Sequence, residues 1–302
     1  MAQEPVFVVG GGTMGRGIAA ICALRGFPTA VFEADSGTRA GLRQAIEASW
    51  SRAGARGKLS ADDVRSAGER LSIASTLAGA AGSAVVVEAV TENLALKQEI
   101  FRVLDVTCPP PALLTSNTSS LPIGRIAEGL EHPERVLGLH FFNPVTTVPL
   151  VEVVRTSETA PEAERRAVAF AEALGKQVVR VRDAPGFATS RLGVALGLEA
   201  MRMVEEGVAE AADIDRAMEL GYGHRMGPLK TSDLVGLDVR LAIAETLAAE
   251  LDARRFEPPA LLRRMVDEGR TGKKAGRGFY AWDREKPVPL TAERGASEGG
   301  EG

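Results

Sequence analysis

Val6-Phe7-Val8-Val9-Gly10-Gly11-Gly12-Thr13-Met14-Gly15 is the stretch that decides the fold. Its first four residues are apolar and β-branched or aromatic, and they end at a glycine, as a buried parallel strand does. Small, helix-compatible residues then run on to Leu24. In such a turn the first glycine permits the tight bend, the second lets a pyrophosphate approach the backbone, and the third lets helix and strand pack closely. The stretch therefore predicts a helix N-terminus that holds the phosphates of a dinucleotide.

The next strand supports this prediction and indicates which dinucleotide is bound. Residues 29–32 are a second short apolar run, and Glu33 ends it. A carboxylate at this position can bind the ribose hydroxyls and repel the 2′-phosphate of NADP, which favours NAD. Asp35 and Arg39 lie close by and weaken this preference for NAD over NADP. The alternative is a domain of the same fold that binds another adenosine cofactor, or none.

Strands and helices alternate through the first part of the chain. Further strands are expected at 84–90, 113–116, 136–140 and 150–154, and helices at 38–70 and 93–106. This alternation predicts an α/β fold in which helices cover both faces of a mostly parallel sheet. We therefore expect an N-terminal Rossmann-like NAD-binding domain over residues 1–184.

The pattern of predicted elements changes after Asp183-Ala184-Pro185-Gly186. Strand signals vanish, and helices are expected at 188–207, 213–220, 233–252 and 259–268, with Asp213 and Asp233 as N-caps. These residues predict an all-helical C-terminal domain over 185–283. Residues 284–302 are rich in Pro, Gly, Ser and Glu, and we expect a disordered tail there.

Composition excludes several classes of function. The 302 residues are 45% hydrophobic and 25% charged, a globular balance, and the net charge of −4 speaks against a nucleic-acid partner. No run of about 20 apolar residues indicates a membrane span, and the N-terminus does not read as a signal peptide. Cys22 and Cys108 fit neither a metal-ligand spacing nor a disulfide framework, so we expect no metal and a cytoplasmic location.

A histidine and a glutamate stand out as candidate catalytic residues. His140 ends the strand expected at 136–140, and Glu152 lies inside the apolar strand 150–154. If residues 136–154 form a simple hairpin, the two side chains lie opposite each other, with Cβ atoms roughly 5 Å apart. The carboxylate would then fix the tautomer of a general base and stabilise its protonated form. The alternative is a strand-capping histidine and a structural ion pair.

Several segments resemble the L-3-hydroxyacyl-CoA dehydrogenase family, which includes the bacterial 3-hydroxybutyryl-CoA dehydrogenases. They are Gly10 to Ala19, Glu88-Ala89-Val90-Thr91-Glu92-Asn93-Leu94 with Lys97, Ser116-Asn117-Thr118-Ser119-Ser120-Leu121, Gly138-Leu139-His140-Phe141-Phe142-Asn143-Pro144, Asp183 to Phe187, Met226-Gly227-Pro228 and Gly276 to Tyr280. The resemblance extends from residue 5 to about residue 283, and the part from Ser116 to Pro144 is the most specific.

The resemblance implies a reversible oxidation of a (3S)-3-hydroxyacyl-CoA to a 3-oxoacyl-CoA, with NAD as acceptor. It implies that His140 takes the proton of the 3-hydroxyl group, that Glu152 orients His140, and that Ser119 hydrogen-bonds the reacting oxygen. The implied cofactor-binding residues are Gly10, Gly12, Thr13, Met14, Gly15, Glu33, Ala89, Glu92, Lys97 and Asn117. The implied CoA-binding residues are Ser49, Arg56 and Asn143. For Ser49 and Arg56 the alternative is a solvated helix face.

Three features depart from the family pattern. One is the segment Val145 to Pro149, which replaces a stretch that usually carries methionine and lysine. The family usually has an asparagine that contacts the substrate and the catalytic histidine where this chain has Ser190. We expect a changed rate or substrate preference, unless Ser190 simply starts the first helix of the second domain. Arg225 replaces a proline that the family often has, and it either meets an acidic acyl tail, such as that of 3-hydroxyadipyl-CoA, or is solvated.

The leading hypothesis is an NAD-dependent dehydrogenase of short-chain 3-hydroxyacyl-CoA, such as 3-hydroxybutyryl-CoA, in fatty-acid or butanoate metabolism. The alternatives are a 3-hydroxyadipyl-CoA dehydrogenase of aromatic catabolism, a crystallin-like enzyme that oxidises a sugar acid of the L-gulonate type, and a redox-inactive binding protein that keeps the fold. A homodimer is expected, because residues 188–207 hold more apolar side chains than one exposed helix face needs: Leu192, Leu196, Leu198, Met201, Met203 and Val204.

Overall fold

The structure, a computed structural model, describes residues 4–283 and 286–289. The chain forms two compact units, which divide between Phe187 and Ala188. Each unit packs around apolar side chains of its own. Among the described residues, no helix is long and apolar enough to cross a membrane.

The first unit is built on one sheet of eight strands in the order β3-β2-β1-β4-β5-β6-β7-β8. All neighbouring strands are parallel except β6 and β7, which are antiparallel. The strands are β1 Val6–Val9, β2 Thr29–Phe32, β3 Leu71–Ala74, β4 Val85–Glu88, β5 Leu113–Ser116, β6 Val136–Phe141, β7 Leu150–Arg155 and β8 Gln177–Arg182. The predicted α/β class is confirmed, whereas the two edge strands β3 and β8 were not predicted. Every residue of β8 is at least partly exposed, so this strand lacks the buried apolar run that marks the central strands.

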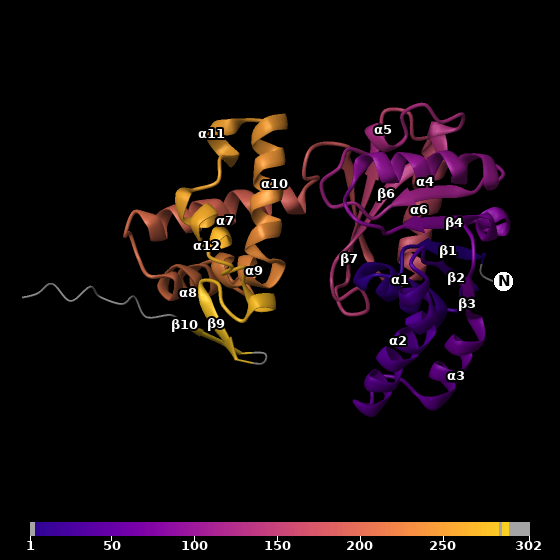
Figure 1. Ribbon diagram of the computed structural model, residues 1–302, viewed down its shortest axis with the longest axis horizontal. Helices are drawn as coiled ribbons and strands as arrows, with labels where there is room; N and C mark the ends of the chain where they lie inside the picture. Colours follow the sequence, from indigo (N-terminus) through magenta and orange to yellow (C-terminus); the bar gives the residue numbers. More distant parts are fainter. Residues whose placement is uncertain (1–3, 284–285, 290–302) are drawn as a thin grey trace, which may run out of the picture. The chain divides into compact units, whose positions relative to one another are not determined.

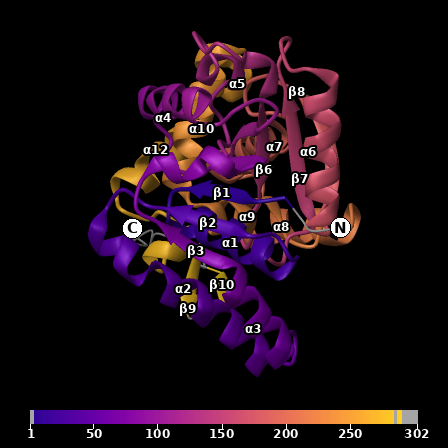
Figure 2. The ribbon, with the colours of Figure 1, turned by 90° about the vertical axis from the view of Figure 1, so that its right-hand side faces the viewer.

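Helices cover both faces of this sheet, as the alternation along β1 shows. Val6 and Val8 belong to the core under α1, α2 and α6, whereas Phe7 and Val9 belong to the core under α4 and α5. Figure 1 shows α1 and α4 on opposite sides of β1 and β4, and Figure 2 shows β1, β2 and β3 side by side. The helices are α1 Thr13–Leu24, α2 Ser36–Ala55, α3 Ala61–Arg70, α4 Leu94–Thr107, α5 Ile123–Ile126 and α6 Pro161–Ala173, with the 3-10 helices η1 Leu77–Gly82 and η2 Pro133–Arg135.

The second unit is helical, as expected, and carries one strand pair that was not predicted. Its helices are α7 Thr189–Glu205, α8 Ala211–Gly221, α9 Pro228–Val235, α10 Leu237–Glu250, α11 Ala253–Phe256 and α12 Ala260–Asp267, with the 3-10 helix η3 Lys273–Ala275. β9 Tyr280–Asp283 pairs antiparallel with β10 Lys286–Pro289 (Figure 1). The predicted disordered tail is therefore wrong for residues 286–289, because β9 supplies their pairing partner. Residues 284–285 and 290–302 of that tail lie outside the described residues.

Both predicted N-caps in the second unit are wrong. α8 begins at Ala211, which leaves Asp213 in its first turn. Asp233 lies inside α9, and the helix predicted at 233–252 is two helices that meet at Gly236, whose φ is +103°. Asp233 is 1% exposed and accepts hydrogen bonds from three groups of a distant segment: Phe279 N, Tyr280 N and Trp282 Nε1. These partners are more than 40 residues away, so local sequence could not distinguish this aspartate from a cap.

Candidate active site

The predicted cofactor-binding and catalytic residues of the first unit gather at one edge of the sheet. The strands β1, β4, β5 and β6 are neighbours, and Val9, Glu88, Ser116 and Gly138 stand in one row across them. The glycine turn, the 89–92 segment, the 117–119 segment and His140 all come at or after this row. Ligands of open α/β sheets bind at this carboxyl edge, so the topology brings the predicted cofactor and catalytic residues to the expected place.

The glycine turn after β1 has the geometry that its sequence predicts. Gly10 has φ of +106°, and a Cβ there would lie 2.7 Å from the carbonyl oxygen of Ala89. A Cβ on Gly15 would lie 1.8 Å from the carbonyl oxygen of Gly10. A Cβ on Gly12 would meet nothing within 4 Å. The fold itself thus requires the first and third glycines, and the second leaves open space in front of the helix N-terminus, as the phosphates of a dinucleotide need.

A cavity of about 620 Å³ opens beside this turn. Six of the predicted cofactor-binding residues line it: Gly10, Gly12, Thr13, Met14, Glu33 and Ala89. Its wall also includes apolar side chains of α4, namely Leu96, Ile100 and Val103. A polar turn facing an apolar wall suits a nucleotide, which presents phosphates at one end and a flat base at the other.

Glu33 is held at the cavity by the backbone around it. Its Oε2 accepts from Gly11 N at 2.7 Å, and its Oε1 accepts from Asp35 N at 3.0 Å. Asp35 caps α2 by accepting from Thr38 N, and Arg39 donates to the carbonyl oxygens of residues 33 and 34. Asp35 and Arg39, which weakened the sequence-based preference for NAD over NADP, therefore both bind local backbone. The carboxylate of Glu33 faces the cavity, which fits NAD.

The pairing predicted between His140 and Glu152 is confirmed. The two residues are direct partners in the antiparallel β6–β7 pair, and His140 Nδ1 lies 2.8 Å from Glu152 Oε2. His140 is 6% exposed and Glu152 is fully buried. An ionised carboxylate can only accept, so Nδ1 carries the hydrogen and Nε2 is the basic nitrogen of the neutral ring. The rings of Phe142 and Phe187 pack on the imidazole at 4.4 and 5.8 Å between centroids.

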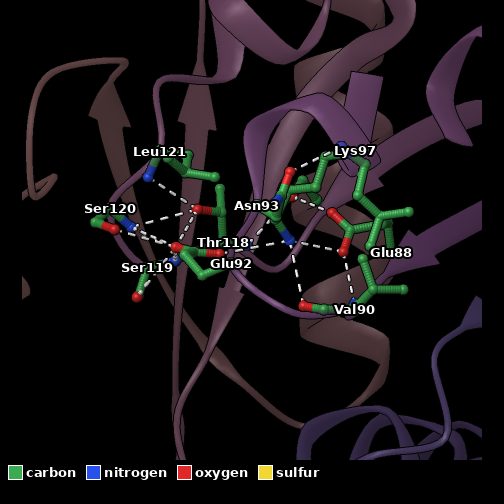
Figure 3. A network of polar contacts seen from close by, with 11 residues as sticks. Glu88, Val90, Glu92, Asn93, Lys97, Thr118, Ser119, Ser120 and Leu121 are labelled. Atoms are coloured by element: carbon green, nitrogen blue, oxygen red, sulfur yellow. Dashed lines mark hydrogen bonds and ion pairs between the residues drawn. The ribbon is translucent and has the colours of Figure 1, made fainter. Parts of the chain in front are cut away.

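Ser119 lies in a short segment that one carboxylate holds (Figure 3). Glu92 Oε1 accepts from the hydroxyl of Thr118 at 2.6 Å, from Ser119 N at 3.0 Å and from Ser120 N at 3.2 Å. The Ser119 hydroxyl lies 3.4 Å from the same oxygen. Burial by itself would raise the pKa of Glu92, but the charge of Lys97 and these hydrogen bonds hold that pKa below its ordinary value. Glu92 therefore acts as an anion that orders the segment carrying Ser119.

Lys97 is buried beneath this segment. Its side chain is 1% exposed, and Nζ lies 2.7 Å from Glu88 Oε1, 3.4 Å from the carbonyl oxygen of Val90 and 3.5 Å from Glu92 Oε2. Three protein acceptors thus surround the ammonium group, and the cofactor contact that the resemblance implies for Lys97 stays a prediction.

Sequence reasoning assigned no role to Glu88. This residue ends the apolar strand β4 and is 0% exposed, and its carboxylate accepts from Lys97 Nζ, from Val90 N at 2.6 Å and from the Ser116 hydroxyl at 2.6 Å. The signal was available, because a charge in a buried strand needs a partner. The same reasoning that selected Glu152 would have selected Glu88.

Asn117 joins the two halves of the site. Its Oδ1 accepts from Phe141 N at 2.9 Å, next to His140, and its own N–H donates to the carbonyl oxygen of Glu88 at 2.7 Å. The ends of β4, β5 and β6 are therefore tied together on the side where His140 lies.

The remaining predicted residues are described each within its own unit. The Ser49 hydroxyl donates to the carbonyl oxygen of Ile46 in its own helix at 2.6 Å, and Arg56 is the exposed C-cap of α2. Asn143 is exposed after β6. Ser190 lies in the first turn of α7 in the second unit, and Arg225 is an exposed residue before α9. Their predicted contacts with substrate stay predictions.

A glycine turn with a nucleotide-sized cavity, on the same sheet edge as a His–Glu pair, defines a dinucleotide-dependent dehydrogenase of the Rossmann class. Comparison with known proteins then specifies the family. Residues 5–184 match the model for the NAD binding domain of 3-hydroxyacyl-CoA dehydrogenase, and residues 186–282 match the model for its C-terminal domain. The chain belongs to the 3-hydroxyacyl-CoA dehydrogenase family, and its cofactor is NAD.

Individual relatives support this assignment. The chain is 46% identical to a 3-hydroxybutyryl-CoA dehydrogenase of Mycobacterium tuberculosis over 93% of its length and 99% of the relative. It is 39% identical to a 3-hydroxyadipyl-CoA dehydrogenase of Escherichia coli over 96% of its length and 62% of the relative. The crystal structure of FadB2 from M. tuberculosis superposes with a TM-score of 0.90 at 45% identity, covering 94% of this chain and all of that one.

Proposed function

We propose that this NAD-dependent 3-hydroxyacyl-CoA dehydrogenase acts on short acyl chains, with 3-hydroxybutyryl-CoA as its preferred substrate, and that His140 is its general base. The hydrogen bond of His140 Nδ1 to the buried carboxylate of Glu152 carries this proposal. It leaves Nε2 as the proton acceptor and provides a fixed negative charge for the imidazolium that forms.

In the oxidative direction, His140 Nε2 takes the proton of the 3-hydroxyl group, and Glu152 stabilises the resulting positive ring. NAD, when bound, supplies the acceptor for the hydride that leaves C3. The Ser119 hydroxyl hydrogen-bonds the reacting oxygen as it becomes a carbonyl. In the reverse direction the protonated His140 returns its proton to that oxygen. The turn residues Gly10 to Gly15 and Glu33 hold the cofactor.

The same proposal gives each of the two parts of the chain a function. Residues 1–184 would bind NAD and residues 185–283 would contribute to substrate binding and dimerisation. Ser190 would replace the family's asparagine with a shorter hydrogen-bonding group. Ser49, Arg56 and Asn143 would contact the CoA part of the substrate. We also propose a cytoplasmic location, which the two free, buried cysteines fit.

A kinetic series over acyl chains tests the substrate. We expect kcat/KM to be highest with 3-hydroxybutyryl-CoA and to fall with longer chains, as measured by NADH formation. A higher value with 3-hydroxyadipyl-CoA would contradict the proposal and favour a role for Arg225. Free CoA should compete with the substrate, whereas it would not compete in an enzyme that oxidises a sugar acid.

The variant His140→Ala tests the base in the same assay. Because positioned acid–base groups contribute roughly 10²- to 10⁴-fold, we expect kcat to fall by that factor with NADH binding retained. His132, the N-cap of η2, has a side chain that is 40% exposed and provides the control His132→Ala, which should keep full activity. Full activity in His140→Ala would remove His140 from the mechanism.

A homodimer through the second unit is part of this proposal. Of the apolar residues counted in α7, Leu198 and Met201 are buried in the core of their own unit, but Leu192 is 71% exposed and Leu196 is 37% exposed. We expect Leu192→Asp to shift sedimentation from dimer towards monomer, while Val106→Asp, at an 84% exposed residue of α4, leaves it unchanged. A wild-type chain that sediments as a monomer would contradict the dimer.

A further inference from the structure

A series of three charged side chains, two of them buried, runs under the segment that carries Ser119. Glu88, Lys97 and Glu92 place two carboxylates around one ammonium, at 2.7 and 3.5 Å from it. The side chains of Glu88 and Lys97 are 0% and 1% exposed, whereas that of Glu92 is 37% exposed. Lys97 thus links a fully buried carboxylate to one that reaches the site, and Figure 3 shows the three side chains in this sequence.

Glu88 and Glu92, at the two ends of this series of charges, both accept hydrogen bonds from residues 116–120. At the buried end, Glu88 Oε2 accepts from the hydroxyl of Ser116, and the same hydroxyl oxygen accepts from Thr118 N at 3.2 Å. At the other end, Glu92 Oε1 accepts from Thr118, Ser119 and Ser120. The stretch from Ser116 to Ser120 is therefore held from both sides, with Asn117 and Ser119 between the anchors.

The carboxylate of Glu88 also reaches the cofactor cavity through the backbone. Its Oε1 accepts from Val90 N, and Val90 lines the cavity beside Ala89. One buried carboxylate thus holds a wall of the cavity directly and the Ser119 segment through Lys97. A buried ion pair used only for stability has no need of contacts to two separate parts of a site.

We propose that Glu88 is a positioning residue of this dehydrogenase, which acts through Lys97 and Glu92 to hold Ser119, and through Val90 to hold the wall of the NAD cavity. The proposal rests on the proposed role of Ser119 in hydrogen-bonding the reacting oxygen. An amide does not reproduce the contacts of Glu88: its single oxygen can accept from Lys97 Nζ and Val90 N, but its NH2 group then faces the Ser116 hydroxyl, which must turn from donor to acceptor, and the negative charge beside Lys97 is lost.

The first test compares Glu88→Gln with a matched control on the same helix as Lys97. Asp105 and Arg135 form another buried pair at 2.7 Å, with side chains 3% and 5% exposed, and Asp105 also accepts from Glu131 N. Both Glu88→Gln and Asp105→Asn should lower Tm, because each leaves a buried cation without its full partner. Only Glu88→Gln should lower kcat, by roughly tenfold to a hundredfold, since small misplacements of reacting groups are costly. It should also raise the dissociation constant of NADH severalfold, measured by fluorescence titration.

A double-mutant cycle tests the route through Lys97. If Glu88 acts on Ser119 largely through this residue, the loss of kcat in Glu88→Gln/Lys97→Met is smaller than the product of the two single losses. The contacts of Glu88 with Val90 N and the Ser116 hydroxyl do not pass through Lys97 and account for any loss beyond that of Lys97→Met alone. The double variant carries no unpaired buried cation, so it also serves if Glu88→Gln fails to fold. Multiplied losses in the double variant would overturn the proposal, as would a Glu88→Gln variant that loses Tm but keeps kcat and NADH affinity within twofold of wild type. Suppose that the wild-type protein oxidises no 3-hydroxyacyl-CoA but Glu88→Gln still raises the dissociation constant of NADH severalfold. The proposed substrate is then wrong, and the role of Glu88 at the NAD cavity is retained.

Discussion

Glu152 carries a negative charge in the buried middle of β7, and His140 explains why such a residue is tolerated there. An unpaired buried carboxylate is strongly destabilising, whereas one that accepts a hydrogen bond from an imidazole gains a partner and gives that ring a defined tautomer. The stability of the strand and the orientation of the base thus depend on the same contact.

The variant Glu152→Gln should show whether catalysis depends on the negative charge at this position or only on the size of the side chain. The amide keeps the size of the side chain but cannot stabilise an imidazolium, so we expect kcat to fall by roughly tenfold or more while the KM for acyl-CoA changes little. Glu162→Gln, at an exposed i,i+3 pair with Arg165, is the matched control and should behave as wild type. Equal kcat values in the two variants would show that the charge of Glu152 has no part in proton transfer.

At the scale of elements, the β1–α1 turn uses its glycines for two different purposes. Gly10 and Gly15 are required by close contacts within the fold, as the carbonyl oxygen of Gly10 occupies the place of a Cβ on Gly15. Gly12 meets no such contact, so its lack of a side chain serves the ligand that approaches the turn.

Alanine substitutions should distinguish the two purposes. We expect Gly15→Ala to lower Tm by several degrees and to abolish NADH binding, because α1 must move away from β1. Gly12→Ala should keep the Tm of wild type and raise the dissociation constant of NADH by roughly tenfold or more, since a methyl group would stand where the pyrophosphate approaches. A loss of Tm in Gly12→Ala equal to that in Gly15→Ala would contradict this division.

For the whole molecule, two units with separate cores imply two separate responses to pH. In the first unit the pKa of Glu92 lies below its ordinary value, so its contribution to stability is present above about pH 4.5 and is lost as the pH falls through the lower folded value. In the second unit burial raises the pKa of Asp233, and the nearby Asp215 adds to that effect. The folded second unit therefore binds a proton before the unfolded chain does, and this term favours folding more as the pH falls from neutrality.

Each unit has one tryptophan that can report on it, Trp50 in the first and Trp282 in the second. In a Trp50→Phe background, denaturant unfolding followed by Trp282 fluorescence measures the second unit. We expect the difference in unfolding free energy between this background and its Asp233→Asn derivative to shift in favour of aspartate as the pH is lowered from 7.5 to 5. A difference that stays constant over this range would mean that Asp233 binds no proton in the folded unit between pH 7.5 and 5.

The sequence by itself determined the features that depend on neighbours along the chain. The β1–α1 turn follows from glycine spacing, and the His140–Glu152 pairing follows from two short strands joined by a brief connection. Only the tertiary structure decided the contacts between distant segments. Glu88 meets Ser116 across 28 residues, Asp233 meets the β9 segment across more than 40, and the edge strands β3 and β8 are defined by their pairing with β2 and β7. Local periodicity does not reveal such partners. They are selected by burial and hydrogen bonding between segments that are distant in the sequence and meet only in the folded chain.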